Sequence, residues 1–519
     1  MKILTVVLLV CFFALMIGVG FYSRKKATDV NGFVLGGRSV GPWLTAFAFG
    51  TSYFSAVIFV GYAGQFGWNF GLSSTWAGLG NAFIGSLLAW NILGRRTRVM
   101  TQHYDAKTMP DFFGKRFDSK ALKIAASIIV FIFLIPYTAS LYNGLSSLFG
   151  LVFEIPYWVV ILVMAVLTGI YVIFGGYMAT AINDFIQGII MLFGITAVIV
   201  SVLVQNGGLV EAMKTLSTIE GDAGWAGAYS SFLGPDPLAL LFVVILTSLG
   251  TWGLPQMVGK FYAIKDEKSV KAGTIISTIF AFIVAGGCYF LGGFARLYSN
   301  NPAIYKDDGT VMYDSIIPTM LDNLPVILVG VVIVLVLSAS MSTLSSLVLT
   351  SSSTVTLDLI EQIKPGNKNA DKKKKEKTQL ITMRVLLVFF IVVSVLLSLN
   401  PPTFIAQLMG YSWGALAGAF LAPFLWGLYW KKTTKLSVWV CFIFGVGFTV
   451  CNMFFKFIAS PINAGAVTML AGLVIVPLVS LITPKLSKDK VDGIFSCYDE
   501  TVTVEKRYSL PENAPADET

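Results

Sequence analysis

The stretch PVILVGVVIVLVLSASMSTLSSLVL, from Pro325 to Leu349, contains no charged residue. A helix that spans a bilayer needs about 20 mostly apolar residues, so this run is long enough to cross a membrane. Its second half contains SASMSTLSS, which has six hydroxyl side chains between Ser338 and Ser346. An unpaired polar group in hydrocarbon costs free energy. The stretch therefore predicts a membrane helix whose hydroxyl groups have partners within the protein.

The rest of the chain has the same character. Of its 519 residues, 55% are hydrophobic and 13% are charged, whereas a soluble domain carries about 25% charged residues. Thirteen apolar runs are centred near residues 12, 55, 83, 137, 167, 194, 247, 284, 340, 391, 416, 445 and 472. We therefore predict an all-α polytopic protein of the lipid bilayer with about 13 transmembrane helices.

The basic residues predict how the helices are oriented. With the N-terminus outside, alternating crossings place 32 of the 37 Lys and Arg residues in the inner segments, which are 23–41, 95–123, 259–271, 362–384, 431–435 and 485–519. This distribution follows the positive-inside rule and predicts a plasma-membrane protein with a cytoplasmic C-terminus. It also accounts for the net charge of +9, so no nucleic-acid partner is expected. The polar tail from Leu486 is expected to be disordered.

Two spans are interrupted by residues that weaken a helix. The second span has Gly50, polar residues at 51–53 and Ser55, and the seventh has Gly250, Gly253 and Pro255. These spans lie five apart and cross in opposite directions, which is typical of inverted repeats in transporters. Ordinary membrane glycines are the alternative. We predict an additional N-terminal helix at 1–26, repeat halves at 38–205 and 236–430, two additional helices at 435–484 and a cytoplasmic tail at 485–519.

Charged residues are absent from the thirteen predicted cores. Proton-coupled carriers normally use a titratable group inside the membrane and voltage sensors use repeated arginines, so neither is expected. A small hard cation such as sodium needs only oxygen ligands. Ser342 and Thr343 lie one helical turn after Ala339, and the interrupted second span supplies backbone oxygens near Thr51 and Phe54. The alternative is that the serines bond to their own backbone or join helices, the role expected for Ser345 and Ser346.

Other kinds of site are not indicated. The five cysteines form no CxxC pair and His103 is the only histidine, so no disulfide framework, zinc site or cofactor is expected apart from a co-transported sodium ion. An enzyme is not expected, because no buried constellation of His, Asp and Glu is predicted. An ion channel is an alternative of another class, but no filter sequence is present. The oligomeric state stays open.

Several motifs resemble one known family in matching order. They are FVLGGRSVGPWLTAFAFGTSYFS (33–55), PDFFGKRF (110–117), FGGYMATAINDFIQG (174–188), LPQMVGKFYAIKD (254–266), SASMSTLSS and SWGALAGAF (412–420). From about Phe33 to Lys432 the chain resembles the sodium:solute symporter family, and its sodium/proline symporters most closely. This resemblance implies a leucine-transporter-like fold with a five-plus-five inverted repeat that works by alternating access.

The resemblance also implies roles for individual residues. The family's sodium site matches the backbone oxygens of Thr51, Phe54 and Ala339 and the hydroxyls of Ser342 and Thr343. Asp184 matches an acidic residue of the sodium path or gate, and its alternative role is a carboxylate favoured by a helix N-terminus. The expected substrate residues are Ser52, Tyr53, Ser55, Tyr137 and Trp252.

The substrate is less well defined than the ion. Tyr53 stands where proline symporters have an aspartate, and Thr247 and Thr251 stand where they have an aromatic pair. The sequence therefore predicts a sodium-coupled secondary active symporter that imports a small organic solute. An amino acid such as proline is the first interpretation, and a monocarboxylate, a vitamin or a sugar is the alternative.

Overall fold

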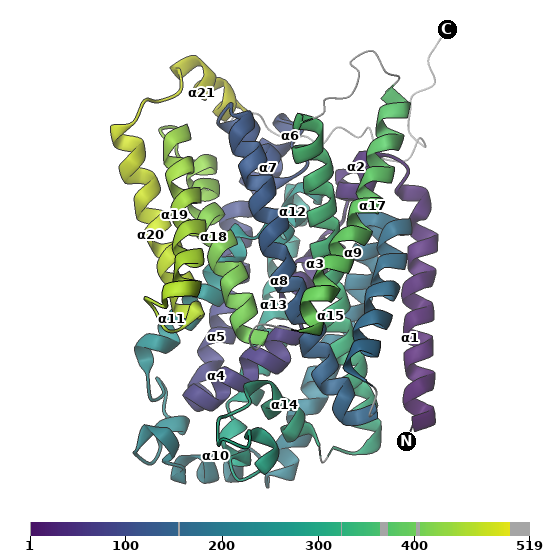
Figure 1. Ribbon diagram of the computed structural model, residues 1–519, viewed down its shortest axis with the longest axis vertical. Helices are drawn as coiled ribbons and strands as arrows, with labels where there is room; N and C mark the ends of the chain where they lie inside the picture. Colours follow the sequence, from purple (N-terminus) through teal and green to yellow (C-terminus); the bar gives the residue numbers. More distant parts are fainter. Residues whose placement is uncertain (1, 154–155, 323, 364–371, 401–404, 499–519) are drawn as a thin grey trace.

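The computed structural model describes residues 2–153, 156–322, 324–363, 372–400 and 405–498. These residues form a bundle of helices in which the long helices run roughly along one axis (Figure 1). The only strand-like pairings among them are two isolated bridges. The predicted all-α architecture is therefore confirmed.

The helices have the following bounds. They are α1 (Lys2–Ser23), α2 (Val30–Leu35), α3 (Pro42–Tyr53), α4 (Ala63–Phe70), α5 (Thr75–Gly80), α6 (Arg95–His103), α7 (Met109–Arg116), α8 (Lys120–Phe153), α9 (Tyr157–Gln205), α10 (Leu209–Thr218), α11 (Pro237–Leu249), α12 (Pro255–Ala263), α13 (Glu267–Gly292), α14 (Tyr313–Leu321), α15 (Val326–Thr354), α16 (Glu361–Ile363), α17 (Lys372–Leu399), α18 (Ile405–Tyr429), α19 (Lys435–Phe455), α20 (Pro461–Ile482) and α21 (Lys488–Phe495).

The number of membrane crossings follows from helix length. In the described residues, 10 helices are long and apolar enough to span a membrane, or 11 if the bent pair Pro237–Gly253 and Pro255–Ala263 is one span. Two of them, Val57–His103 and Trp158–Gln205, have 47 and 48 residues, which is about 70 Å at 1.5 Å per residue. That is more than twice the ~30 Å hydrocarbon thickness. Each is interrupted by a glycine of positive φ, Gly71 or Gly176. If each break separates two crossings, and the part before Gly71 is taken together with α3, the described helices provide the 13 crossings that the sequence predicts.

The outer surface of the bundle is apolar. Exposed large hydrophobic side chains lie on the outer helices α1, α9, α13, α17 and α20, for example Val10, Phe193, Ile275, Val385 and Val474. Apolar surface of this extent on a soluble monomer would be unusual. It is the surface that a bilayer covers, so the protein is a multi-pass membrane protein.

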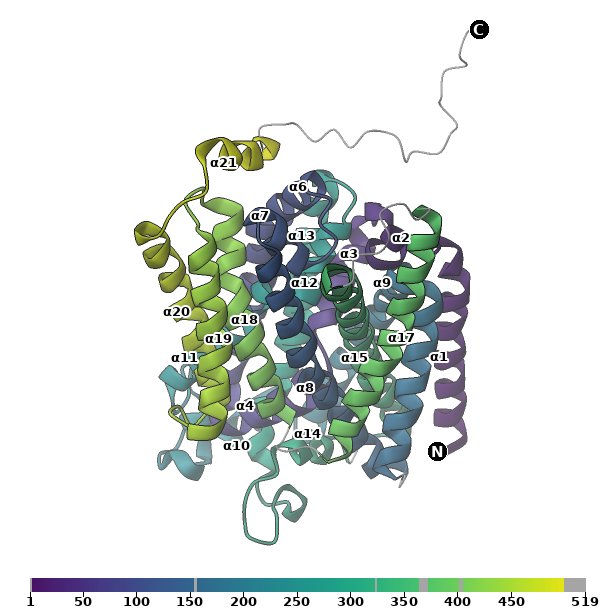
Figure 2. The ribbon, with the colours of Figure 1, turned by 45° about the horizontal axis from the view of Figure 1, so that its top comes forward.

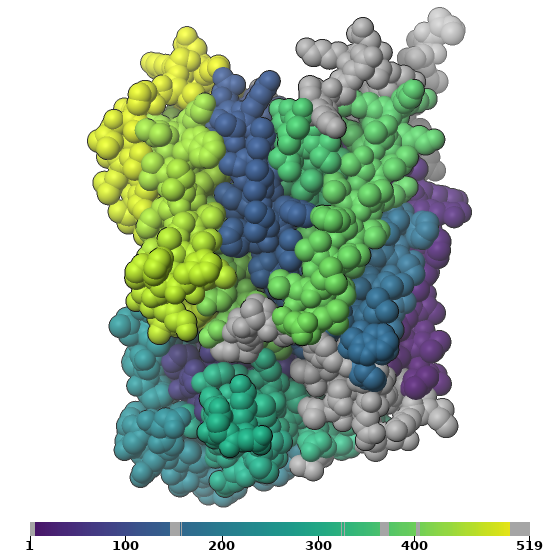
Figure 3. Space-filling model, viewed as in Figure 1, coloured from purple at the N-terminus to yellow at the C-terminus, as the bar shows by residue number. Residues whose placement is uncertain are grey.

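The helices form two outer groups around a central one. The group α18, α19 and α20 packs together on one side and α1 packs against α9 on the other, with α3, α8, α12, α13 and α15 between them (Figures 1 and 2). Figure 3 shows the segment containing α7 and α8, in dark blue, at the surface between these groups. We call the end with α6, α7 and α21 the α6–α7 end, and the opposite end the α10–α14 end.

Two broken spans lie in the central group. In the first broken span, α3 ends at Tyr53 and the backbone of Phe54 is extended (φ −76, ψ 116). The span then continues as a π-helix from Val57 to Tyr62. The second continues from α11 through the 3-10 turn Gly250–Gly253 to an extended Leu254 (φ −87, ψ 121) before α12 begins at Pro255. Proline suits this first helical position because it has no N–H to leave unpaired.

Two backbone hydrogen bonds join the start of the first broken span to the end of the second. The N–H of Val40 donates to Ala263 O at 3.2 Å, and the N–H of Lys265 donates to Val40 O at 3.0 Å. The start of α3 therefore meets the end of α12 at one end of the bundle. This antiparallel relation agrees with the predicted inverted repeat, and the exact bounds of the two halves stay a prediction.

The expected disorder of the C-terminal tail is wrong up to Tyr498. Residues 488–495 form α21, which buries Val491, Ile494 and Phe495. The Arg116 guanidinium lies 5.1 Å from the Phe495 ring centroid. Apolar residues at 491, 494 and 495 have the spacing of one helix face, a short signal that the polar composition of the tail obscured. Residues 499–519 lie outside the described part of the chain.

Candidate functional site

The break after α3 exposes backbone oxygens in the centre of the bundle. The hydroxyls of Thr51 and Ser52 donate to Phe47 O at 2.9 Å and Ala48 O at 2.6 Å. Such local bonds compete with the regular helix ladder. The chain then becomes extended at Phe54, which leaves the carbonyls of Thr51 and Phe54 beside α15.

The hydroxyl-rich part of α15 faces these carbonyls. Thr343 Oγ1 lies 3.0 Å from Thr51 O, 3.3 Å from Phe54 O and 3.2 Å from Ala339 O. Ser342 Oγ lies 3.2 Å from both Thr51 O and Ala339 O. We call these five atoms the oxygen cluster.

The oxygen cluster has more acceptors than donors. Three of its atoms are carbonyl oxygens, and the two hydroxyls bring one proton each. Thr343 therefore donates to one of its three neighbours at a time, and the remaining lone pairs converge without a proton between them. All five residues are buried, with exposed fractions of 1% or less. Such a cluster is suited to a small cation that binds neutral oxygens.

The structure thus brings together the five residues predicted to bind sodium. Thr51 and Phe54 come from one broken span and Ala339, Ser342 and Thr343 from α15. The geometry follows from the break in α3 and the helical spacing of α15. That sodium occupies the cluster stays a prediction.

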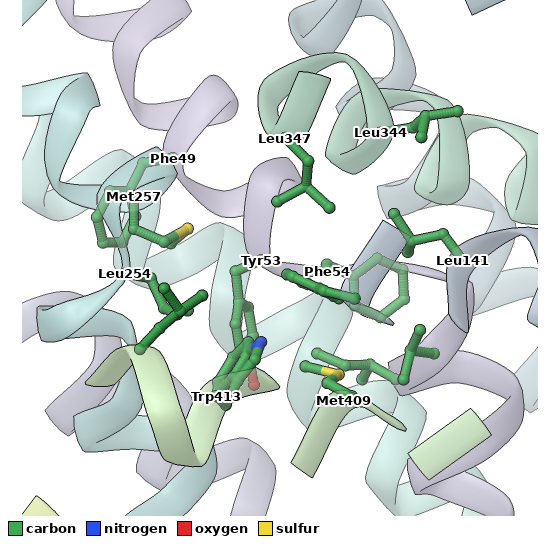
Figure 4. Packing of buried hydrophobic residues seen from close by; sticks show 14 of the residues in the cluster. Phe49, Tyr53, Phe54, Leu141, Leu254, Met257, Leu344, Leu347, Met409 and Trp413 are labelled. Atoms are coloured by element: carbon green, nitrogen blue, oxygen red, sulfur yellow. The ribbon is translucent and has the colours of Figure 1, made fainter. Parts of the chain in front are cut away.

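Aromatic residues lie beside the α3 break. The ring centroids of Tyr53 and Trp413 are 5.9 Å apart, and those of Tyr137 and Trp413 are 6.0 Å apart in an edge-on arrangement. Figure 4 shows Tyr53 and Trp413 in contact, with Leu347 of α15 directed toward Tyr53 and Phe54. We call Tyr53, Tyr137 and Trp413 the aromatic cluster.

Trp413 was not among the residues that the sequence predicted for the site. It lies on α18 and is completely buried. The sequence signal was a large aromatic residue within SWGALAGAF, where almost all neighbours are small. Small residues let helices approach closely, and Trp413 is the largest side chain among them.

Polar atoms near the aromatic cluster lack partners. Within the described residues, several buried side-chain atoms make no hydrogen bond, among them Tyr53 OH, Ser55 Oγ, Tyr62 OH, Tyr137 OH, Tyr289 OH and Trp413 Nε1. A buried polar group without a partner is costly. These groups therefore line a neutral polar region that a bound solute could satisfy.

Ser52 and Trp252 have other contacts. Ser52 Oγ lies 2.8 Å from Ser346 Oγ of α15, and Trp252 Nε1 donates to Ile84 O at 3.0 Å. Ser52 thus faces α15, and the indole N–H of Trp252 is already paired. Ser346 was expected to serve only packing, but its hydroxyl also contacts the hydroxyl of Ser52.

Two charged residues are buried inside the bundle, although neither falls within one of the thirteen predicted cores. Asp184 of α9 and Lys260 of α12 are buried, with Asp184 Oδ2 and Lys260 Nζ 3.6 Å apart. The basic segment around Lys260 resembled a loop, and Asp184 was expected at a helix mouth, so their meeting was not foreseen. The argument against proton coupling from an absence of titratable groups therefore does not hold.

The fold and the site together define a secondary transporter. Two antiparallel broken helices that supply backbone oxygens near the middle of a membrane bundle are characteristic of this class. The chain belongs to the sodium:solute symporter family, whose family model matches residues 33–445.

Known proteins of similar sequence agree with this assignment. The chain is 30% identical over 448 residues to the osmoregulated proline transporter OpuE of Bacillus subtilis, which covers 86% of this chain and 88% of that protein. It is 30% identical over 442 residues to a sodium/proline symporter of Staphylococcus aureus, which covers 83% of this chain and 82% of that protein.

Solved structures agree on the fold. A Na+-coupled sialic acid symporter in a substrate-bound outward-open state has a TM-score of 0.74 at 16% identity, covering 93% of this chain and 99% of that one. A nucleobase-cation-symport-1 family transporter in a closed conformation has a TM-score of 0.50 at 13% identity, covering 89% of this chain and 97% of that one. The predicted leucine-transporter-like fold is confirmed.

Proposed function

We propose that this protein is a sodium-coupled secondary active symporter that imports a small amino acid such as proline by alternating access. The observation that carries the proposal is the convergence of three carbonyls and two hydroxyls between α3 and α15. The sodium-coupled and proline-transporting relatives support it. Sodium is the co-transported ion, and no other cofactor is required.

The position of the oxygen cluster explains coupling. Thr51 and Phe54 belong to the proposed first half, and Ala339, Ser342 and Thr343 to the second. Sodium bound between the halves stabilises the conformation in which both sets of ligands meet. Tyr53 and Phe54 are consecutive residues of the same break, so ordering this segment around sodium also positions Tyr53 for the solute. A ligand shifts a conformational equilibrium by its differential affinity for the two states.

The substrate region favours a zwitterion or a neutral solute. The aromatic cluster and Ser55 present rings, hydroxyls and an indole N–H. Broken helices add partial charges of both signs, because a helix N-terminus is positive and a helix C-terminus negative. A small amino acid carries a carboxylate and an ammonium that match these ends. Ser52 and Trp252 then act from the edge of the region, through α15 and η5 (Asn81–Leu88), respectively.

We propose the plasma membrane as the location, with the N-terminus outside. The α6–α7 end contains basic residues from the segments predicted to lie inside, for example Arg38, Arg95, Arg98, Lys123 and Lys431. By the positive-inside rule this end is cytoplasmic. Asp184 then lies between the oxygen cluster and the cytoplasm, on the proposed sodium path.

Uptake by purified protein in liposomes tests the function. Radiolabelled proline is offered with an inward sodium gradient, with a proton gradient and no sodium, or with neither. Accumulation that requires sodium supports the proposal, and full accumulation with protons alone contradicts it. Excess unlabelled amino acids, monocarboxylates, vitamins and sugars are then compared as competitors, and the class that blocks uptake identifies the substrate.

A further inference from the structure

A buried ion pair lies beside Ser346, which follows Thr343 of the oxygen cluster by about one turn of α15. Asp184 and Lys260 have side-chain exposed fractions of 0% and 4%, and their closest charged atoms are 3.6 Å apart. Asp184 belongs to α9 and Lys260 to α12, so the pair joins the two proposed halves. Neither the sodium nor the substrate role proposed above uses Lys260.

The ammonium of Lys260 is surrounded as a bound cation would be. It donates to Ser346 Oγ at 3.0 Å and lies 5.2 Å from the centroid of the Tyr177 ring. Aromatic faces attract cations. Ser346 in turn contacts Ser52, the neighbour of Thr51. A carboxylate, a hydroxyl and an aromatic face thus converge on one positive charge.

Asp184 depends on that positive charge. Both of its carboxylate oxygens are buried and make no hydrogen bond within the described residues. A buried carboxylate is tolerated only when it is paired with a cation or hydrogen-bonded. If Lys260 lost its charge, another cation would be the simplest replacement.

Water can approach the pair from the α6–α7 end. A cavity of about 40 Å³ is lined by Lys260, Ser346 and Tyr177 together with Lys107, Thr108 and Met109. One water needs about 10–15 Å³ of such volume. The cavity is therefore large enough for a sodium ion with part of its hydration shell.

We infer that the Lys260 ammonium is a tethered cation that fills a second cation site formed by Asp184 and Ser346. This inference rests on the proposed sodium site in the oxygen cluster, since the tethered charge stands on the route from that site to the cavity. With the second site filled by the protein's own cation, a single sodium binds in the oxygen cluster. Removing the charge of Lys260 opens the second site to sodium.

Equilibrium binding of radioactive sodium to purified full-length protein tests the inference. Lys260→Met is expected to bind one sodium more per protein than the unaltered chain. Lys260→Arg keeps the charge and is expected to bind the unaltered number. Lys260→Met combined with Asp184→Asn is expected to lose the additional sodium. Lys431→Met is the matched control, because Lys431 is half-exposed and pairs with Asp492.

A second background separates this inference from the proposed function. Ser342→Ala with Thr343→Ala removes the hydroxyls of the oxygen cluster but leaves Asp184 and Ser346. The double variant alone is expected to bind no sodium. If adding Lys260→Met to it restores the binding of one sodium, that ion occupies the second site and not the oxygen cluster. If the unaltered protein binds no sodium while Lys260→Met binds one, the oxygen cluster fails and the second site stands.

Thermal unfolding keeps the test decisive if Lys260→Met is unstable. The variant is then purified and heated in sodium chloride and in choline chloride. The inference requires sodium to raise its midpoint more than that of the unaltered chain, and Asp184→Asn to abolish the difference. Equal sodium binding and equal sodium stabilisation in Lys260→Met and the unaltered protein would overturn it.

Discussion

Ser342 and Thr343 supply the two hydroxyls that α15 offers to the carbonyls of the α3 break. Replacing either with alanine removes a ligand at a site with no exposed residue. Loss of one hydrogen-bonding partner in a buried polar site costs roughly 1–3 kcal/mol. At about 1.4 kcal/mol per tenfold change, we expect the half-saturating sodium concentration to rise some ~5- to 150-fold. Sodium titrations of proline uptake, normalised to the amount of protein, measure this.

Ser352→Ala is the matched control for these variants. Ser352 is also buried on α15, but its hydroxyl bonds back to Leu349 O at 3.2 Å. Its replacement should leave the sodium dependence unchanged. If Ser342→Ala and Thr343→Ala behave like this control, the oxygen cluster serves packing and not sodium.

Tyr137 provides a separate test of the substrate region. Its buried hydroxyl has no hydrogen bond within the described residues, so Tyr137→Phe should not destabilise the fold. If a polar group of the solute pairs with this hydroxyl, its loss should raise the half-saturating substrate concentration roughly ~5- to 150-fold. Uptake titrations and thermal unfolding are compared. Unchanged substrate dependence would exclude a direct contact.

Some residues of the site could be predicted from the sequence and others could not, for physical reasons. Ser342 and Thr343 could be found because helical spacing alone puts them beside Ala339. Lys260 could not, because its neighbours Lys265, Lys268 and Lys271 made the segment resemble a cytoplasmic loop. Its burial results from the packing of α12 against α15 and α3, which is tertiary information.

At the scale of helices, Gly176 allows α9 to break. It has φ 53 and ψ −145, and an added Cβ would lie 2.8 Å from Phe33 O. Gly176→Ala should therefore destabilise the protein by about 1–3 kcal/mol. Gly286→Ala in α13 is the control, because its Cβ would meet nothing within 4 Å. Thermal unfolding in detergent should show a lower midpoint for the first variant only, and equal midpoints would contradict this.

The short helix α7, which is not one of the membrane-spanning helices, is held by a charged contact. Asp111 Oδ1 lies 2.8 Å from Lys123 Nζ and Oδ2 lies 2.9 Å from Lys115 Nζ. Burial acts to raise the pKa of Asp111, but Lys123 and Lys115 outweigh it and hold the pKa below its ordinary value. Because its pKa is lower in the folded than in the unfolded state, the Asp111 carboxylate stabilises the fold at pH values above its ordinary pKa of about 4. This stabilisation is lost as the pH falls through the pKa of the folded state.

Asp111→Asn should therefore cost about 1.5–3 kcal/mol at neutral pH, the range for hydrogen bonds to charged groups. The difference from the unaltered protein should shrink as the pH falls below about 4. Unfolding midpoints across pH measure this, with Asp307→Asn in an exposed loop as the control. A difference that stays constant with pH would show that the charge of Asp111 is not the cause.

Helices were predicted well where the local sequence decides them. The break after α3 follows from residues 50–55, whose hydroxyls bond to their own helix. Helix α21 was missed because it packs against residues distant in sequence, such as Arg116 against the Phe495 ring and Lys431 beside Asp492. Polar composition alone does not reveal such contacts.

Across the whole molecule, orientation decides in which direction sodium and solute move. Lys374 is exposed in the first turn of α17, which begins at the α6–α7 end, and Thr215 is exposed in α10, which lies at the opposite end (Figure 1). The positive-inside rule places the first inside the cell and the second outside. After the five native cysteines are replaced, Thr215→Cys should react with a membrane-impermeant maleimide on intact cells. Lys374→Cys should react only after the membrane is opened.

The reverse labelling pattern would invert the proposed transport direction. The oxygen cluster would then reach the outside through the cavity beside Lys260, and the tethered charge would oppose sodium entry rather than act on the release path. The two labelling sites therefore test the positive-inside argument and the proposed role of the Asp184–Lys260 pair together. With the expected pattern, sodium enters from the α10–α14 end, meets the oxygen cluster first, and passes Asp184 on its way to the cytoplasm.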